Sequence, residues 1–192
     1  LTLFGQEFPW SRFPQSEAQL VFARGLGAAR SGNTAAARQD LDRLQVLRDA
    51  LVAAKNGYWA EQVDIQHRVV AAWIARAEGK KDDALALLRS AADREDATEK
   101  HPVTPGPLVP ARELLGEMLL ESNEPAQALK EFEASMRVEP NRFRGLFGAA
   151  RAAELAGDRT KARTYYSQLV ALGEKADSER PEIRQAKTFV GK

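Results

Sequence analysis

The chain has 192 residues and a formal net charge of +1, because its 28 Lys and Arg almost balance its 27 Asp and Glu. This balance argues against a general nucleic-acid or membrane-surface binder, since both need an excess of basic residues. The sequence contains no cysteine, which excludes disulfides, thiolate metal sites and cysteine nucleophiles. Its 33 alanines, against 21 Val, Ile and Thr together, favour helix over sheet.

Both ends of the chain are abrupt. The sequence begins at Leu1, without an initiator methionine and without the basic and apolar start of a signal peptide. We therefore expect a fragment of a longer protein, or a mature form whose leader has been removed. No stretch approaches about 18 consecutive apolar residues, so we expect no membrane insertion. The composition is compatible with the cytoplasm and, after removal of a leader, with the periplasm.

Residues 1–16 form an aromatic-rich N-terminal segment, with Phe4, Phe8, Trp10 and Phe13 among two prolines. We expect this segment to cover the apolar face at that end of the helical region that follows it. Two alternatives stay open: a mobile arm, and the remainder of a preceding repeat.

Residues 17–176 contain four alanine-rich helix pairs, each divided by a short turn. The turns contain Gly32, Gly79, Asn123 and Gly157, and Gly and Asn tolerate the left-handed backbone at the end of a helix. The predicted pairs cover residues 18–51, 65–98, 109–142 and 143–176.

Small and large residues recur at fixed distances from these turns. A small residue lies seven positions before each turn and another five positions after it, and a large residue lies nine positions after it. The small residues are Gly25, Ala72, Gly116 and Ala150 before the turns and Ala37, Ala84, Ala128 and Ala162 after them; the large ones are Leu41, Leu88, Phe132 and Tyr166. Small residues allow the two helices of a pair to approach, and the large residue then fills the gap between successive pairs.

Two intervals between turns are longer than the 34 residues from Asn123 to Gly157. The 47 residues from Gly32 to Gly79 predict two lengthened helices, with a stop at Asn56-Gly57 and a helix from Tyr58 to Ala77. The other interval contains a proline-rich insertion at 99–110, where four prolines within nine residues exclude helix. Insertions in repeat arrays often form loops on the binding side.

Residues 177–192 contain a last predicted helix, from Pro181 to Val190, with the proline in its first turn. Terminal repeats need a polar cover over their apolar face, because no further repeat packs on them. We therefore expect this helix to cap the array.

The third pair resembles a tetratricopeptide repeat (TPR), because Leu115-Gly116, Ala128, Phe132 and Pro140 follow the spacing of that signature. The fourth pair keeps the small residue and the aromatic, whereas the first two have leucine in place of the aromatic. The chain is similar to a TPR protein of bacterial type with about four repeats. The resemblance implies an all-α fold, a right-handed α-solenoid of antiparallel helix pairs (TPR superhelix) with a C-terminal capping helix.

Neither histidine lies in a recognised metal or catalytic motif. His67 has one carboxylate, Asp64, among its helical neighbours, and we interpret it as structural. A zinc or calcium site at His101, which follows three acidic residues, is a less favoured alternative because no recognised spacing supports it. The sequence has no phosphate-binding glycine loop and no catalytic serine motif. We expect no enzymatic activity and no cofactor.

The TPR resemblance implies that the first helix of each pair lines a groove for a peptide or a partner helix. Aromatic and arginine side chains in such a groove are frequent binding hot spots. We therefore predict a non-catalytic scaffold that binds a protein or peptide, without the Lys and Asn clamp that holds chaperone tails. The groove candidates are Gln19, Phe22, Leu26, Gln66, Val69, Trp73, Arg76, Glu113, Glu117, Leu120, Arg144, Phe147 and Arg151.

Two other interpretations stay open. Trp73 and Phe147 have the helical spacing of core residues as well as of groove residues. Glu113 and Glu117 have the spacing to pair with arginines on the neighbouring helix, Arg144 and Arg151, and so to hold the array together. The whole array would then be a spacer, or a weakly self-associating module that uses the N-terminal aromatic segment.

Overall fold

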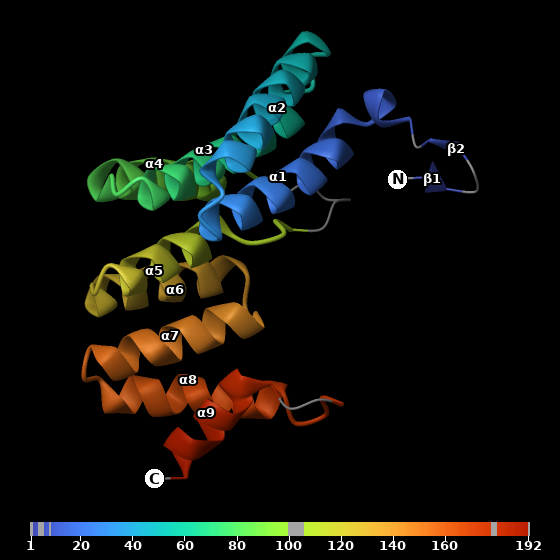
Figure 1. Cartoon of the computed structure of the whole chain (residues 1–192). Coiled ribbons are helices and arrows are strands. Elements are labelled where there is room, and N and C mark those ends of the chain that lie inside the picture. Colours follow the sequence, from blue (N-terminus) through green and yellow to red (C-terminus); the bar gives the residue numbers. More distant parts are fainter. Residues whose placement is uncertain (1, 4–5, 8, 100–105, 178–179, 192) are drawn as a thin grey trace. The chain divides into compact units, whose positions relative to one another are not determined.

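The computed structural model describes residues 2–3, 6–7, 9–99, 106–177 and 180–191. These residues form nine α-helices, a 3-10 turn at Trp10–Arg12 and one antiparallel pair of two-residue strands, β1 (Thr2–Leu3) and β2 (Gln6–Glu7). Apart from that short strand pair, which was not predicted, the fold is all-α (Figure 1). The chain divides into two compact units, Leu1–Glu99 and Lys100–Lys192.

Unit 1 consists of two antiparallel helix pairs. Each helix packs against the next, and the first also packs against the third. The helices are α1 (Pro14–Arg30), α2 (Thr34–Ala53), α3 (Gly57–Ala77) and α4 (Lys81–Ala97). With 20 and 21 residues, α2 and α3 are the two lengthened helices that the interval between turns predicts.

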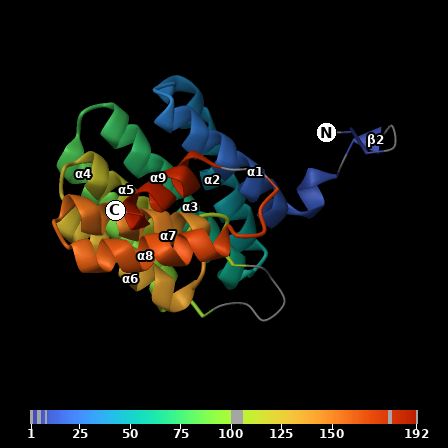
Figure 2. The ribbon, with the colours of Figure 1, turned by 90° about the horizontal axis from the view of Figure 1, so that it is seen from below.

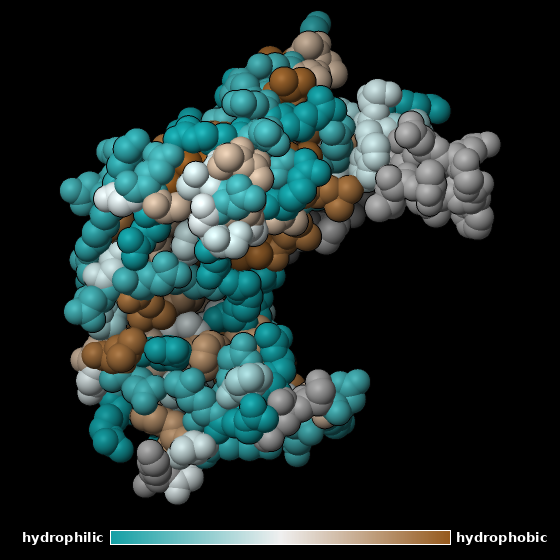
Figure 3. All heavy atoms as spheres, in the orientation of Figure 1, coloured by the Kyte–Doolittle hydropathy of each residue, from teal (hydrophilic) through white to brown (hydrophobic). Residues whose placement is uncertain are grey.

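Unit 2 repeats this arrangement with shorter helices and adds a final one. Its helices are α5 (Ala111–Glu121), α6 (Pro125–Val138), α7 (Phe143–Leu155), α8 (Arg159–Leu172) and α9 (Pro181–Val190). The range of α9 matches the predicted one, and α9 packs against α8 (Figure 2). Ile183 and Ala186 of α9 are buried. On the face drawn in Figure 3, hydrophilic side chains cover most of each unit, with smaller hydrophobic areas between them.

The four predicted turns are confirmed by their backbone angles. Gly32, Gly79, Asn123 and Gly157 have φ values of 82°, 79°, 60° and 82°, so each occupies the left-handed region directly after a first helix. This conformation lets the chain reverse within three residues, because it exposes the last helical carbonyls to new amide donors.

The predicted stop at Asn56-Gly57 is wrong in detail. The residue with positive φ is Lys55, at 56°, whereas Asn56 is the N-cap of α3 and its side chain accepts a hydrogen bond from the Trp59 amide. Gly57 is the first residue of α3. An asparagine at a helix junction serves equally as a left-handed end or as an N-cap, so the residue type alone does not separate the two.

Phe132 fills the space between the third and fourth pairs, as predicted. A Cβ atom added to Gly116 on α5 would lie 2.8 Å from its ring, and one added to Gly148 on α7 would overlap it further. Phe132 itself is fully buried. The two glycines therefore allow α5 and α7 to close on one aromatic ring, and α6 ends at Val138, before Pro140.

The N-terminal segment is described only in part. Phe4 and Phe8 lie outside the described residues, so their predicted covering role is not tested. Within the described part, Trp10 is half-buried in the 3-10 turn that packs on α1, and Phe13 is 39% exposed. No helix in the described ranges is both long and apolar enough to cross a membrane.

Candidate functional site

The groove candidates lie on the first helices of the four pairs, and their exposure separates them into two groups. Those that keep some exposure are Gln19, Gln66, Arg76, Glu117, Leu120, Arg144, Phe147 and Arg151. Those that are buried are Phe22, Leu26, Val69, Trp73 and Glu113. The buried ones belong to the core, which corrects the prediction that they line an open surface. The correction has a physical cause in unit 1, where α1 packs on both α2 and α3 and its buried stripe is correspondingly wide.

Trp73 illustrates this correction most clearly. Its side chain is 3% exposed, and the guanidinium of Arg30 lies over its ring with Cζ 4.4 Å from the ring centroid. A cation at this distance is attracted by the electron-rich face of the indole. Trp73 is therefore a core residue covered by the end of α1, and of its two interpretations, core and groove, the first is confirmed.

Two acidic residues of α5 are bound by arginines at the start of α7. Glu117 pairs with Arg144, whose Nε lies 3.1 Å from Oε1, so the predicted pairing is confirmed for this residue. Glu113 pairs instead with Arg142, whose Nε lies 2.6 Å from Oε1. Arg142 also donates to the carbonyl of Leu108, at 3.2 Å. The prediction for Glu113 named the wrong arginine, because Arg142 precedes α7 in the loop and is not on its helical face.

Glu113 is fully buried, and this sets its electrostatics. Burial raises the pKa of its carboxyl group, and the hydrogen bond from Arg142 counteracts part of that rise. Its second oxygen, Oε2, is buried and has no hydrogen-bond partner in the described part of the chain. A carboxylate closed off from solvent in this way joins two helices and has no access to a substrate.

The unit 2 candidates that keep some exposure lie on α5 and α7, two helices that pack against each other. We call these candidates the α5–α7 surface; they are Glu117, Leu120, Arg144, Phe147 and Arg151. Arg144, Phe147 and Arg151 follow one another at helical spacing, so they share one face of α7. The ring of Phe147 is half-buried, with its centroid 6.5 Å from that of Tyr166 on α8. Arg144 and Arg151 are exposed on either side of it.

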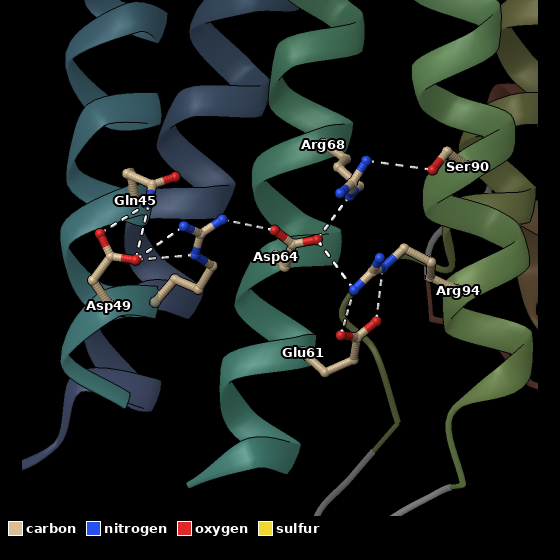
Figure 4. Close-up of polar contacts among 8 residues, drawn as sticks. Gln45, Asp49, Glu61, Asp64, Arg68, Ser90 and Arg94 are labelled. Atoms are coloured by element: carbon tan, nitrogen blue, oxygen red, sulfur yellow. Dashed lines mark hydrogen bonds and ion pairs between the residues drawn. The ribbon is translucent and has the colours of Figure 1, made fainter. Parts of the chain in front are cut away.

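A polar network in unit 1 was not predicted from the sequence. Asp64 on α3 accepts from Arg48 on α2 at 3.0 Å and from Arg68 at 2.7 Å, and Arg94 on α4 lies 3.5 Å away (Figure 4). Arg94 also binds Glu61 through two nitrogens, at 2.8 and 2.6 Å. Burial alone would raise the pKa of Asp64, but the arginine hydrogen bonds outweigh it and the pKa is lowered.

This network connects three helices through one carboxylate. Its members alternate in charge, and each arginine already has an acidic partner. The periodic Asp and Arg residues of α2, α3 and α4 were a signal that charged side chains meet there, but sequence spacing does not show which helices lie side by side. We interpret the network as structural.

The histidines do not form a metal site in the described residues. His67 is half-buried; burial lowers its pKa, with an opposing contribution from Asp64. No group of three or more His, Cys, Asp or Glu side chains in the described ranges is arranged to hold a metal ion. His101 lies outside those ranges, so the alternative site at His101 stays a prediction.

The similarities of this chain to known proteins are weak. No protein-family model matches the chain, and no curated protein matches it. Among solved structures, the MamA protein is similar with a TM-score of 0.48 and 14% identity, over 86% of this chain and 98% of that one. PilF of Pseudomonas aeruginosa is similar with a TM-score of 0.44 and 16% identity, over 92% of this chain and 89% of that one. The chain is an all-α protein of sequential antiparallel helix pairs, a description that rests on its own turns and packing.

Proposed function

We propose that the chain is a non-catalytic, TPR-like module that binds a protein or peptide. The observation that carries this proposal is the α5–α7 surface, in which an aromatic ring lies between two exposed arginines on one helix face. Phe and Arg side chains of this kind are frequent sources of binding energy at protein interfaces. The proposed site is smaller than the predicted groove and lies within unit 2.

The α5–α7 surface is also preorganised for binding. Phe147 is supported from behind by Tyr166, whose hydroxyl donates to Glu154 at 2.7 Å and accepts from Gln185 at 2.9 Å. Arg144 is held by Glu117. A partner would therefore order few side chains on this surface, which reduces the entropic cost of binding. Arg151 remains available for a carboxylate or a carbonyl of the partner.

A scaffold role is further supported by how the chain uses its buried acidic groups. Glu113 is bound by Arg142 from the loop before α7, and Asp64 is bound by Arg48 of α2 and by Arg68 of its own helix. Buried carboxylates that are committed to ion pairs define the arrangement of helices, whereas an acid–base catalyst needs a path to its substrate.

Site-specific photo-crosslinking tests the proposal. A benzophenone amino acid placed at Arg151 should capture a discrete partner from the source cells, and the same group at Arg163, an exposed arginine on α8, should not. The double variant F147A/R151A should lose co-purification of that partner, whereas R163A should retain it. Equal capture from both positions, or unchanged recovery with F147A/R151A, would contradict the assignment of this surface.

The alternative is a structural or self-associating array. Some charged side chains of unit 2 pair with each other and are therefore less available for contacts between copies. Lys161 binds Glu133 at 2.7 Å, and Arg144 binds Glu117. Sedimentation over a range of concentrations, with and without residues 1–13, distinguishes a self-associating array from a monomeric module. The truncation leaves α1 intact, because α1 begins at Pro14. A strictly monomeric profile for both chains would remove self-association.

A further inference from the structure

Unit 1 contains an open cleft of about 570 Å³ between α2, α3 and α4. Its floor is apolar and is formed by Leu41, Ala71, Ile74, Ala75, Ala86 and Leu87. Polar side chains form its edge. One end has Arg38, Glu78, Lys80 and Asp83, and the other end has Ser90. A volume of this size is in the range of binding pockets. Because the cleft is open, one face of a partner helix fits it better than a small molecule that needs to be enclosed.

The cleft lies where the first two pairs join, and this joint differs from the one between the third and fourth pairs. Leu41 is nine residues after its turn, the position that Phe132 and Tyr166 hold in the last two pairs. Those rings are fully buried, whereas Leu41 is half-buried and lines the cleft. Leu88, at the same position of the second pair, is also fully buried. The partial exposure of Leu41 therefore results from the packing between the first two helix pairs and not from the presence of leucine at this position.

The dimensions of the floor indicate what it can receive. The cleft extends along α3 from Ala71 to Glu78 and along α4 from Asp83 to Ser90. Seven residues of helix correspond to about 10 Å, or two turns. The small alanine side chains leave space between the larger side chains of the floor. Two apolar side chains one turn apart on a partner helix fit into this space and match its length.

The charged side chains of the cleft, two cations and two carboxylates, lie at one end of it. Glu78 binds both Lys80, at 3.0 Å from Oε2, and Arg38, so two cations share one carboxylate. These hydrogen bonds, that of Lys80 first, lower the pKa of Glu78. Asp83 lies in the first turn of α4, where the positive end of the helix dipole offsets its charge. Arg38 and Lys80 are more than half exposed, so both can reach a further carboxylate.

We infer that this cleft binds an amphipathic helix of a partner protein that presents two large apolar side chains one turn apart and a carboxylate one turn beyond them. The apolar side chains lie on Leu41, Ile74 and Leu87, and the carboxylate faces Arg38 and Lys80. This surface is on the α2 and α4 side of α3, in the other unit from the α5–α7 surface. The inference is therefore independent of the proposed function.

The chain itself does not present such a helix in its described part. The large apolar side chains that α2 exposes, Val46 and Val52, are six residues apart and so lie on different faces. Helices α1, α6, α7 and α8 each expose a single one, at Leu20, Val138, Leu155 and Leu172. A different protein is therefore favoured over a second copy as the occupant.

The test uses the full chain and a synthetic probe. The probe is an alanine-based helical peptide with leucine at i and i+4 and glutamate at i+8; its controls have lysine at i+8, or alanine at i and i+4. Methyl NMR of labelled Ile and Leu follows the titration. The glutamate peptide should shift the methyl signals of Leu41, Ile74 and Leu87 in a saturable manner. The lysine peptide should bind about tenfold more weakly, which corresponds to about 1.4 kcal/mol.

Variants of the chain locate the binding. Ala86→Leu fills the cleft from an exposed position and should abolish the shifts, whereas Ala126→Leu adds the same side chain at an exposed site on α6 and should not. R38Q/K80Q should remove the preference for glutamate over lysine while keeping the fold, as checked by circular dichroism. Absence of shifts with the glutamate peptide, equal binding of both peptides to the unmodified chain, or self-association abolished by Ala86→Leu would overturn the inference.

Discussion

The Nε of Arg142, at the start of α7, lies 2.6 Å from the carboxylate of Glu113, a fully buried residue of α5. The same arginine donates to the carbonyl of Leu108 in the loop before α5. One side chain thus connects the segment that enters the third pair with the helix that begins the fourth. It provides a specific contact between these pairs in addition to apolar packing.

Removal of this arginine should destabilise unit 2. Arg142→Ala leaves the Glu113 carboxylate buried without its cation, and breaking a buried pair from one side costs about 3–5 kcal/mol. Arg144→Ala is the matched control, because its pair with Glu117 is solvent-exposed and should cost less than about 1 kcal/mol. Urea unfolding measures both. Equal losses for the two variants would show that Glu113 is not buried as described.

The pH dependence of stability should carry opposite contributions from Glu113 and Asp64. Burial raises the pKa of folded Glu113 above its unfolded value, so its contribution is fully present below the unfolded pKa and is lost as pH rises through the folded pKa. The pKa of Asp64 is lowered, so its contribution is present above the unfolded pKa and is lost as pH falls through the folded pKa.

Unfolding free energies measured from about pH 7 down to about pH 3 test these signs. The difference between wild type and E113Q should become more favourable to wild type as the pH falls. The difference between wild type and D64N should become less favourable to wild type over the same range. A common direction for both differences would contradict the assigned burial or ion pairs.

The packing of Phe132 should make Gly148 intolerant of a methyl group. Gly148→Ala places Cβ against the buried ring, and overpacking of this kind costs about 1–3 kcal/mol. Gly27→Ala is the control: nothing lies within 4 Å of its Cβ position on α1, so the substitution should stabilise the helix by about 0.5–1 kcal/mol. Thermal unfolding distinguishes the two, and adding F132L to the Gly148 variant should recover part of the loss.

Trp73 should behave as a core residue. Trp73→Ala removes a large buried side chain and should cost about 3–5 kcal/mol in urea unfolding. Arg30→Ala removes the cation over the ring, and loss of that contact should cost about 1 kcal/mol or less. If Trp73→Ala left stability unchanged, the indole would belong to an open surface, as the groove interpretation expects.

Much of the fold could be predicted because a few positions have strict backbone requirements. The left-handed turn within each helix pair is occupied by Gly or Asn, and the close approach around Phe132 needs glycine, so these residues mark the helix pairs in the sequence. The short strand pair near the N-terminus has no comparable residue requirement that would identify it in the sequence. The sequence does not separate the two possible roles of Asn56, because a helix end and an N-cap favour the same residue. The right-handed superhelix stays a prediction.

The candidate site could be predicted less well. Repeat spacing identifies the first helices, but it does not show which of their faces is covered, and Phe22 and Trp73 prove to be core residues. The pairing of Glu113 with Arg142 depends on a loop residue whose side chain is directed by the turn before α7. Helical spacing correctly placed Arg144, Phe147 and Arg151 on one face, because all three lie within a single regular helix.

The affinity of the captured partner for Arg151 variants tests the central claim most directly. Titration calorimetry with purified partner should give about tenfold weaker binding for R151A than for wild type, and unchanged binding for R163A, with both variants equally stable. Affinities that are the same for wild type, R151A and F147A would contradict the proposal that the chain binds its partner through the α5–α7 surface.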